Sequence, residues 1–589
     1  HGEIRDLIIF LQEHGISTTM AYKIYRTYGR SSFDVLKRNP YQLCLDIWGI
    51  GFKTADQIAL KLGLPEDSLD RVKAYILYLL EKDNEEGHVY SREEEVAGKC
   101  QEELGASLER VKTALSALSA DRSIIKKETP SGCHLYRPFF YQAEEEAARK
   151  LVSLASQDCP VPDFDLERKI EEIEKKSGLV FSPLQKKAIK ASLQKKILII
   201  TGGPGTGKTT IIRAIVDIFD SWPKKVLLAA PTGRAAKRLA EATGREAKTI
   251  HRLLEYQPKE GRFKRDPRHP LRADALIVDE VSMVDLPLMY HLLQALSPEM
   301  RLILVGDQDQ LPPVGPGNLL RDLISSEVIE VIRLNEIFRQ AKESLIVVNA
   351  HRVNQGQPIL YPPRGDPEAD FYFIHQENEE KVLSLILKLC RFSLPKKLGL
   401  SQLSTQIQVI SPMYRGLAGV DRLNLELQKA LNPNSASFQL GSKELRTGDK
   451  VMQTRNNYDK EVFNGDLGTV AQIDPRQLRV LVDFDGRLIT YEKDELSEIV
   501  LAYAISVHKA QGNEYQAVVM PLLTQHYIML QRNLFYTALT RARKMSIIIG
   551  SYRALHIAIK NDRPVNRNSH LKENIQDLMK NPPANFHLY

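Results

Sequence analysis

The sequence predicts a multidomain α/β protein: an α-rich N-terminal region, then two parallel-sheet domains, the second interrupted by a small antiparallel barrel. Two observations lead to this fold class. Apolar strands alternate with helices from about 180 to 345 and again from about 405 to 550, which is typical of βαβ units. Residues 443–495 instead hold short strands of alternating polarity with Gly-Asp turns, a pattern that predicts the barrel.

The N-terminal region contains two similar stretches, "LQEHGISTTMAYKIYRTYG" and "LDIWGIGFKTADQIALKLG", each with a Gly-centred turn before an amphipathic helix. In the second, Gly49 and Gly51 free the backbone to approach a phosphate and Lys53 adds charge, which resembles a helix-hairpin-helix. A helical hairpin without DNA contact is the alternative. Residues 70–140 read as three helices and the hairpin "SIIKKETPSGCHLYRPFF", the outline of a winged helix.

These patterns give expected domain boundaries. They are a helix-hairpin-helix region at 1–68, a winged-helix-like domain at 69–155, a linker at 156–180, a first α/β domain at 181–345, a second at 346–440 and 496–555, the barrel at 441–495 and a C-terminal tail at 556–589. The linker is recognised by its Pro/Asp-rich start, "SQDCPVPDFD". Because the chain opens at "HGEIRDLI", without Met and in helical register, we expect a natural N-terminal portion before it.

Composition narrows the class of protein. The 589 residues are 43% hydrophobic and 26% charged, and the net charge of +7 permits nucleic acid as a partner without demanding it. The five scattered cysteines contain no Cys-x-x-Cys pair, which argues against zinc and a disulfide framework and fits a reducing cytoplasm. No apolar run reaches membrane-spanning length, so we expect a cytoplasmic protein without membrane contact.

The segment "ILIITGGPGTGKTT" predicts a nucleotide site. An apolar strand runs into Gly202-x4-Gly207-Lys208-Thr209, the P-loop spacing in its strand–loop–helix context. Glycines let backbone N–H groups surround phosphates at a helix N-terminus, Lys208 supplies charge and Thr209 a hydroxyl for Mg²⁺. A Gly-rich turn without a ligand is the alternative. The expected ATP-binding residues here are Gly203, Gly205, Thr206, Gly207, Lys208, Thr209 and Thr210.

Polar residues after further strands complete the predicted site. In "ALIVDE", Asp279 suits Mg²⁺ coordination and Glu280 suits polarising the attacking water, although an acid pair at a helix N-terminus would look the same. Gln310 follows the strand of "RLILVGDQDQLPPVGPG" and is placed to sense the γ-phosphate. Gln185 in "FSPLQKKAI" carries an amide that can pair with adenine, yet a Gln at such a position is more often a solvated helix residue.

The order of motifs resembles that of a known family. The series is "LQ", "GGPGTGKT", "APTGRAAKRL", "TIHRLL", "IVDE", "GDQDQLPPVGPG", "IFRQ", "ISPMYRGLAGVDRLN", "SVHKAQGNEYQAVV" and "YTALTRAR". It resembles superfamily 1 (subfamily B) DNA helicases and, more closely, their RecD-like branch. The leader resembles the long form, which works without RecB and RecC. The resemblance spans about residues 1–560.

The resemblance implies an ATP-dependent DNA motor with two RecA-like domains and an inserted SH3-like barrel. It implies movement 5′ to 3′ on single-stranded DNA and unwinding of duplex, in DNA repair or recombination, with ATP and Mg²⁺ as cofactors. It assigns Arg339 and Arg541 as arginine fingers, whereas a lone helical Arg is usually a surface residue, and it places Glu514 near the ribose. The expected catalytic set is then Lys208, Asp279, Glu280, Gln310, Arg339 and Arg541.

The same resemblance implies a track for single-stranded DNA, where sequence-tolerant contacts suit a motor. Each residue taken alone is more often a helix cap or a satisfied polar group. The expected DNA-binding residues are Thr232, Gly233, Arg234, Thr249, His251, Tyr414, Arg415, Ser506, His508, Lys509 and Gln511. Arg455 and Asn456 of the barrel are further candidates.

The stretch 255–272, "EYQPKEGRFKRDPRHPLR", carries six Lys/Arg against three Asp/Glu. In the RecD-like pattern a β-hairpin, the pin, projects here and separates strands. We expect a turn at Lys259-Glu260-Gly261, with both aromatic rings directed toward a base pair; a solvated basic loop is the alternative. The expected pin residues are Tyr256, Lys259, Arg262, Phe263, Lys264 and Arg265.

Other functions share parts of this pattern. An ATP-switched DNA-binding repair protein without strand separation is the main alternative, and an RNA motor is another. A conjugative relaxase would need an N-terminal His cluster and a nucleophilic Tyr, which the leader does not show. The expected partners are single-stranded and tailed duplex DNA, with a single-strand-binding protein as a candidate, and the chain is expected to act as a monomer.

Overall fold

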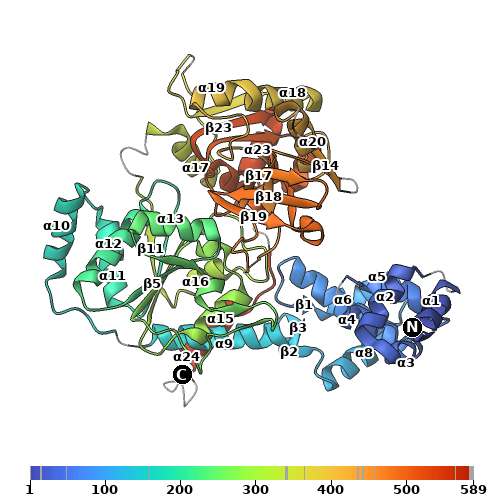
Figure 1. The fold of residues 1–589 in the computed structure, drawn as a ribbon. Coiled ribbons are helices and arrows are strands. Elements are labelled where there is room, and N and C mark those ends of the chain that lie inside the picture. The colour runs from blue at the N-terminus through green and yellow to red at the C-terminus, as the bar shows by residue number, and fades with distance from the viewer. Residues whose placement is uncertain are drawn as a thin grey trace. The chain divides into compact units, whose positions relative to one another are not determined.

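The computed structural model (Figure 1) describes residues 2–13, 16–47, 49–157, 159–337, 343–363, 365–433, 435, 437–440, 443–457, 459–563 and 566–582. The chain forms two compact units. The first comprises His1–Glu146, Val314–Gly317 and Arg567–His570, and the second comprises Ala147–Pro313, Asn318–Asn566 and Leu571–Tyr589. Within the described ranges, no helix combines the length and the apolar character needed to cross a membrane.

The first unit is mainly helical and ends in a small antiparallel sheet of order β1-β3-β2. Its elements are α1 (Gly2–Glu13), α2 (Thr18–Tyr28), η1 (Gly29–Ser31), α3 (Ser32–Arg38), α4 (Gln42–Asp46), α5 (Phe52–Lys61), α6 (Leu69–Glu85), β1 (Ser91–Arg92), α7 (Glu93–Leu104), α8 (Leu108–Ala120), β2 (Ile125–Thr129) and β3 (Gly132–Tyr136). Helix α9 (Pro138–Ala155) follows and continues into the second unit.

Local signals in the sequence start the helices of this unit. Ser17, Ser68 and Ser107 each accept a hydrogen bond from the backbone three residues later and so cap α2, α6 and α8. Arg71 on α6 forms a two-pronged ion pair with Asp56 on α5, at 2.8 and 2.9 Å. This contact fixes the second helical repeat against the predicted winged-helix part.

Two segments from far along the chain complete the first unit. The Arg567 guanidinium donates to the carbonyls of Gly315 (2.6 Å) and Gly317 (2.8 Å), and the Asn568 carbonyl accepts from the Val89 N–H (2.7 Å). A contiguous N-terminal region was expected from the sequence. The expectation was incomplete because such long-range pairing leaves no local pattern in the sequence.

The first parallel sheet of the second unit has the order β11-β4-β10-β9-β5-β6, with helices on both faces (Figure 1). We call this sheet with its helices the first lobe. Its elements are α10 (Leu166–Ser177), α11 (Pro183–Gln194), β4 (Ile197–Gly202), α12 (Lys208–Ser221), β5 (Val226–Ala230), α13 (Gly233–Thr243), β6 (Ala247–Thr249), α14 (Ile250–Leu253), β7 (Tyr256–Gln257), β8 (Arg262–Phe263), β9 (Ala275–Val278), η2 (Val281–Met283), α15 (Leu286–Ala295), β10 (Arg301–Gly306), α16 (Leu319–Ser326) and β11 (Glu330–Leu334).

The second parallel sheet, of order β12-β23-β22-β13-β21, forms the second lobe. Its elements are α17 (Leu345–Asn354), β12 (Phe371–His375), α18 (Glu379–Lys388), the π-helical turn η4 (Leu389–Ser393), α19 (Leu394–Leu398), β13 (Ile407–Ser411), α20 (Val420–Leu431), β21 (Ala504–Ser506), α21 (Val507–Ala510), β22 (Tyr515–Leu522), η6 (Thr524–Met529), α22 (Arg532–Leu539), β23 (Ala542–Gly550) and α23 (Tyr552–Lys560).

An antiparallel sheet of order β19-β18-β17-β16-β20 is inserted between α20 and β21, next to the hairpin β14–β15. Its elements are β14 (Ser437–Leu440), β15 (Lys443–Arg446), β16 (Lys450–Gln453), β17 (Leu467–Asp474), β18 (Arg479–Phe484), β19 (Arg487–Tyr491), η5 (Lys493–Glu498) and β20 (Ile499–Leu501). Buried apolar residues on alternating positions, such as Val480 and Val482, form its core. Together with the two parallel sheets, this insert confirms the predicted fold class.

Two segments differ from what the sequence indicated. The expected linker at 156–180 contains α10, whose Ile170 and Ile173 are buried in the core of the first lobe. The expected tail at 556–589 contains the end of α23 and the further helix α24 (Leu571–Lys580), which buries Leu571 and Ile575 and packs against α16. Both helices are short and largely charged, so their apolar faces did not stand out in the sequence.

Candidate functional site

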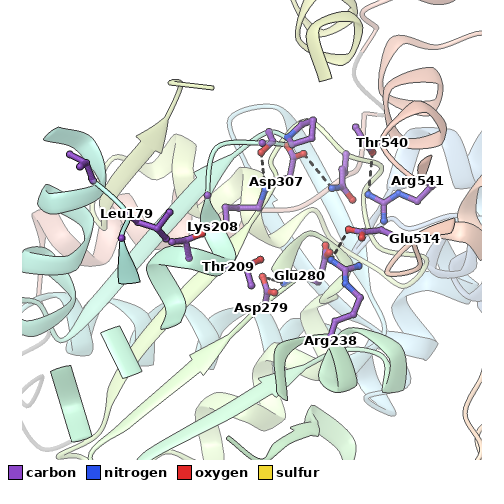
Figure 2. A pocket seen from close by; sticks show the side chains of 18 residues that line it. Leu179, Lys208, Thr209, Arg238, Asp279, Glu280, Asp307, Glu514, Thr540 and Arg541 are labelled. Carbon is purple, nitrogen blue, oxygen red and sulfur yellow. Dashed lines mark hydrogen bonds and ion pairs between the residues drawn. The ribbon is translucent and has the colours of Figure 1, made fainter. Parts of the chain in front are cut away.

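A cavity of about 1010 Å³ lies at the carboxyl edge of the first sheet and is lined by both lobes (Figure 2). Parallel register brings the ends of β4, β9 and β10 side by side, so the loops after these strands meet there. The lining residues are Gly178, Leu179, Val180, Gly203, Pro204, Gly205, Gly207, Lys208, Thr209, Thr210, Arg238, Asp279, Glu280, Asp307, Gln310, Glu514, Thr540 and Arg541.

The P-loop follows β4 and leads into α12 with the expected geometry. Gly207 is the residue before the helix and has φ +82°, a conformation that glycine adopts without strain. A side chain at Gly202 would come within 2.8 Å of the Leu334 carbonyl oxygen, so the backbone passes close to β11 there. The Lys208 ammonium donates to the carbonyls of Gly202 (2.6 Å) and Gly203 (3.0 Å), which holds its charge at the mouth of the loop.

The predicted carboxylate pair lies directly after β9. Burial and the neighbouring Glu280 charge raise the pKa of Asp279 to about 6, while Lys208 and Arg238 act in the opposite direction. Asp279 Oδ1 accepts the Glu280 N–H at 2.9 Å. Glu280 has φ +54°, an unfavourable conformation for a residue with a side chain, and such backbone strain is concentrated at functional sites.

The loop after β10 connects the two lobes. Asp307 is buried and its Oδ2 accepts from the Tyr536 hydroxyl of α22 (2.7 Å) and from the Gln310 amide (3.3 Å). The Leu311 N–H donates to Thr537 Oγ1 at 2.9 Å. Gln310 Oε1 is buried and has no hydrogen-bond partner among the described residues, so this side chain keeps an acceptor available at the cavity wall.

The second lobe contributes Glu514 and Arg541 to the cavity. Arg541 is buried, and its guanidinium donates to the carbonyls of Thr537 (3.2 Å) and Asn513 (3.2 Å) and to Thr540 Oγ1 (3.2 Å). These contacts fix the guanidinium at the same cavity as Lys208. The structure thus brings together Lys208, Asp279, Glu280, Gln310, Glu514 and Arg541, and also Gly203, Gly205, Gly207, Thr209 and Thr210.

Two of the residues predicted to bind ATP, Gln185 and Thr206, are not part of the cavity lining. Gln185 is buried, and its amide bonds to the Ser182 N–H (2.9 Å) and to the Thr206 carbonyl (3.1 Å), so it joins the cap of α11 to the P-loop rather than lining the cavity. Thr206 itself bonds back to the Gly203 carbonyl (2.8 Å). Arg339 lies outside the described residues. The adenine contact of Gln185 stays a prediction.

The predicted DNA-binding residues lie at the carboxyl ends of strands in both lobes. Thr232, Thr249 and Ser506 are the capping residues of α13, α14 and α21, and each hydroxyl accepts a backbone N–H. Gly233 and Arg234 form the first turn of α13, and His508 lies in α21. In the structure these three hydroxyls therefore act as helix caps, which was the alternative to DNA contact for each residue. Both roles are compatible, because a capped helix N-terminus keeps other N–H groups for a phosphate.

Four further predicted DNA contacts show different degrees of exposure. Tyr414 and Arg415 are exposed after β13, and the Tyr414 hydroxyl bonds to Ser506 Oγ at 3.3 Å. The Lys509 ammonium donates to Asn464 of the barrel at 2.8 Å. Gln511 is buried, and its amide donates to the Leu311 carbonyl at 2.9 Å, so it connects the lobes instead of facing an open track.

The barrel packs against this edge of the first lobe. Arg234 donates to the Leu467 carbonyl (3.3 Å), Lys237 pairs with Asp485 (3.2 Å) and Arg252 pairs with Glu461 (2.6 Å). A cavity of about 320 Å³ lies between them, and Gly233, Arg234 and Thr249 line it. The barrel therefore lies over part of the predicted track.

The predicted pin is a short hairpin in which Tyr256 pairs with Phe263 and Gln257 with Arg262. The turn spans residues 258–261, with Gly261 at φ +65°. The two rings pack at the base of the hairpin: Phe263 lies 4.9 Å from Tyr256 and 4.6 Å from His291 between ring centroids, and their contact with a base pair stays a prediction. Aromatic rings gain more from mutual packing than from exposure at a tip.

The charged pin residues and His251 also have local partners. Arg262 pairs with Glu260, while Lys264 and Arg265 pair with Glu255. His251 packs on Phe263 (5.6 Å), and burial lowers the pKa of His251 to about 4. Its ring is therefore neutral at neutral pH, and its contact with DNA stays a prediction. Lys259 is exposed at the turn.

Several cavity residues were not identified from the sequence. Arg238 on α13 pairs with Glu514 at 2.7 Å, Asp307 joins the lobes through Tyr536, and His351 Nε2 lies 3.1 Å from the Pro204 carbonyl of the P-loop. The segment "APTGRAAKRL" contains Arg238, but an Arg on an amphipathic helix is ordinarily a surface residue. Arg238 is distinguished from such surface residues only by its position in a cavity that both lobes line.

Comparison with known families matches four segments of the chain. Residues 1–90 match the ATP-dependent RecD2 DNA helicase HHH domain and residues 423–484 the ATP-dependent RecD-like DNA helicase SH3 domain. Residues 185–316 match an AAA domain, and residues 501–549 the UvrD-like helicase C-terminal domain.

Similar proteins extend over most of the chain. The ATP-dependent RecD2 DNA helicase of Deinococcus radiodurans is 36% identical over 587 residues, which cover 98% of this chain and 78% of that protein. The RecBCD enzyme subunit RecD of Mycobacterium tuberculosis is 30% identical over 458 residues, covering 72% and 77%. Among solved structures, the Pif1 helicase of Candida albicans matches with a TM-score of 0.40 and 21% identity over 69% of this chain and all of that one (100%).

Proposed function

The chain belongs to the RecD2 family of ATP-dependent DNA helicases, and on this premise we propose that it moves 5′ to 3′ along single-stranded DNA and unwinds duplex DNA, in repair or recombination. The direction rests on the RecD-like resemblance. The proposed setting is the cytoplasm, and the free thiols of all five cysteines fit a reducing compartment.

One observation carries the proposal: phosphate-binding and charge-neutralising residues of both lobes line the same cavity. Lys208 and the carboxylate pair come from the first lobe, and Arg541 comes from the second. A nucleotide in this cavity would contact both lobes, so its hydrolysis would change how the lobes are held together. Two lobes that alternate between arrangements on a DNA track are what a translocating motor needs.

The chain's own residues account for the steps of hydrolysis in this proposal. The P-loop N–H groups and Lys208 hold the β- and γ-phosphates, and Glu280 orients and polarises the attacking water. Arg541, buried and fixed by three hydrogen bonds, neutralises charge that develops on the γ-phosphate. Gln310 senses the γ-phosphate through a water molecule that donates to its Oε1, and its amide nitrogen donates to Asp307, which also accepts from Tyr536. Arg339 keeps its proposed role as a second arginine finger, and Gln185 keeps its proposed contact with adenine.

The residues present fit a magnesium ion bound together with nucleotide. Thr209 and Asp279 offer oxygen atoms at the cavity, and the raised pKa of Asp279 beside Glu280 describes a carboxylate pair that a cation would stabilise. In the part of the chain that the structure describes, no group of three or more His, Cys, Asp or Glu side chains is arranged to hold a metal. Phosphate oxygens would therefore supply the remaining ligands. When bound, the ion neutralises phosphate charge.

The proposed DNA ligands are single strands and tailed duplexes, and a single-strand-binding protein is a candidate partner. Exposed Arg415 and Tyr414 and the basic first turn of α13 support a track that combines phosphate contacts with base stacking. We propose that the chain works as a monomer, because both halves of the ATP site come from one chain.

Unwinding of tailed duplexes tests direction and strand separation together. With ATP, we expect displacement from a duplex with a 5′ single-stranded tail and at least about tenfold less from one with a 3′ tail. ATPase activity is measured on the same substrates. ATP hydrolysis without strand displacement from either duplex would favour an ATP-switched DNA-binding protein. Preferential unwinding of the duplex with the 3′ tail would contradict the proposed 5′ to 3′ direction. Stimulation by RNA but not DNA would instead indicate an RNA motor.

Binding to single-stranded DNA is expected to weaken steeply with salt, because phosphate contacts release counterions. Three basic contacts, such as Arg234, Arg415 and Lys509, predict a slope of about −2 for log affinity against log salt, at ~0.7 per phosphate. The measurement is fluorescence anisotropy of a labelled oligothymidine. Arg415→Ala should reduce the slope by about 0.7. The exposed Lys187→Ala on α11 is the control that leaves it unchanged. A flat salt response of the wild type contradicts the electrostatic track.

A further inference from the structure

Helix α13 runs from the predicted DNA track to the nucleotide cavity. Its cap, Thr232, and its first turn, with Arg234, lie at the track. Arg238 follows Arg234 by four residues, so it lies one turn further on the same side of the helix. Arg238 lines the nucleotide cavity. One rigid helical turn therefore separates a predicted DNA contact from a group at the ATP site.

A segment of the second lobe makes a similar connection. It begins at the capping residue Ser506, passes through Lys509 in α21 and ends at Glu514, which lines the nucleotide cavity. Next to Glu514, the Asn513 carbonyl accepts a hydrogen bond from the Arg541 guanidinium at 3.2 Å. This segment therefore supplies one of the three hydrogen bonds that hold the Arg541 guanidinium.

The two connections meet in one ion pair. Arg238 Nη2 lies 2.7 Å from Glu514 Oε1 (Figure 2). The second carboxylate oxygen of Glu514 pairs with Arg543 at 2.5 Å. Burial alone would raise the pKa of Glu514, but Arg238, Arg543 and Arg541 hold it below its usual value, so Glu514 is charged. Both members of the Arg238–Glu514 pair are about three-quarters buried, at 29% and 25% side-chain exposure, so solvent screens this contact less than a surface pair.

The Arg238 guanidinium also has one nitrogen that lacks a hydrogen-bond partner. This atom, Nη1, is buried and makes no hydrogen bond within the described part of the chain. Its charge also acts on Asp279, which places it near the predicted catalytic carboxylates. An Arg bound on one side and unsatisfied on the other can rearrange when its neighbours move.

We propose that the Arg238–Glu514 ion pair couples DNA binding to ATP hydrolysis, with Arg238 as a positioning residue that acts through Glu514 and Asn513 on Arg541. The inference rests on the proposed DNA-motor function. DNA on the track contacts the start of α13 and the segment from Ser506 to Glu514. This contact changes the alignment of Arg238 and Glu514. The ion pair sets the position of Arg541 relative to Lys208 and Glu280, so DNA changes the rate of hydrolysis without touching the nucleotide.

The test is a mutant cycle on the DNA stimulation factor, the ratio of kcat with saturating oligothymidine to kcat without DNA, both at saturating ATP. Arg238→Met keeps the length of the side chain and leaves Glu514 paired with Arg543. We expect this variant to lose about tenfold in the stimulation factor, with a smaller change in DNA-free kcat. Glu514→Gln lowers stimulation similarly, whatever its own effect on ATP affinity, and the double variant loses no more than either single variant.

Two further variants make the result specific. Arg238→Lys keeps the charge and should retain part of the stimulation. Arg245→Met removes a surface pair with Asp220 just after α13, at 55% and 43% exposure, and should leave stimulation unchanged. Thermal unfolding of each variant tests whether the fold is retained. If Arg238→Met is unfolded, the stimulation factor of Arg238→Lys decides the proposal instead.

The outcomes separate the inference from the function on which it rests. Wild-type ATPase that DNA does not stimulate overturns both. Full stimulation in Arg238→Met, with a stimulated wild type, overturns the coupling role and leaves the motor function intact. An equal loss of kcat with and without DNA in Arg238→Met also overturns it, because Arg238 would then act on hydrolysis itself and not on its coupling to DNA. Multiplied losses in the double variant contradict action as a pair.

Discussion

Lys208→Ala is expected to abolish ATP hydrolysis, with a fall in kcat on the order of 100- to 1000-fold or more. The Lys208 ammonium is the cation that the P-loop holds at the mouth of the cavity, by hydrogen bonds to the Gly202 and Gly203 carbonyls. Alanine removes the charge that neutralises the β- and γ-phosphates in the transition state. The measurement is phosphate release with saturating DNA and ATP.

The fold of this variant should be retained. Of the two glycines whose carbonyls lose the ammonium, Gly203 lines the cavity, where water replaces the missing donor. A thermal unfolding curve close to that of the wild type checks this point. Lys187→Ala, which loses a 3.8 Å surface pair with Glu330, is the matched control with unchanged ATPase. Full residual hydrolysis by Lys208→Ala would falsify the assignment of this cavity as the ATP site.

Shortening the pin is expected to remove unwinding while hydrolysis continues. Replacing residues 258–261 by Asn-Gly joins Gln257 to Arg262 by a tight two-residue turn and removes the exposed Lys259. The base of the hairpin stays, because Tyr256 and Phe263 pack on each other and Phe263 packs on His291. A motor without a wedge must wait for the fork to open spontaneously against stacking of about 1.4 kcal/mol per step. We expect unwinding to fall at least about tenfold.

The measurement compares strand displacement with DNA-stimulated ATPase in one preparation. The control replaces residues 475–478, the exposed turn between β17 and β18, by the same dipeptide. This loop has the same length and belongs to the barrel, so general effects of shortening a hairpin appear there too. Unwinding that survives in the pin variant means that the hairpin is not the wedge; parallel loss of ATPase means that the change damaged the motor.

The nucleotide site could be predicted in detail because its chemistry depends on residues close together in sequence. The P-loop glycines are needed for a backbone path, as φ +82° at Gly207 shows, and Lys208 and Thr209 follow at fixed spacing. Asp279 was predicted because the carboxyl ends of parallel strands share one edge. The roles of these residues stay proposals; their convergence in one cavity is a feature of the structure.

Short charged segments and aromatic side chains were predicted less well. Helices α10 and α24 were missed, because a few buried residues such as Ile170 and Ile575 suffice when a neighbouring helix covers them. The packing of Phe263 on His291 was not indicated, because His291 belongs to a different element, α15. Gln185 and Gln511 bond to backbone groups of other segments, contacts that the sequence did not indicate, and their ligand contacts stay predictions.

The sequence by itself determined the fold class and the family, and it predicted the residues of the first half of the ATP site, because strand–helix alternation and motif spacing are local properties of the chain. Only the tertiary structure decided which side chains of the two lobes share a cavity. Arg238 and Glu514, and likewise Asp307 and Tyr536, are separated by more than two hundred residues, and their contacts depend on the packing of two sheets. Contacts of that range leave no periodic or spacing signal in a single sequence, so the Arg238–Glu514 ion pair could be found only from the packing of the two lobes.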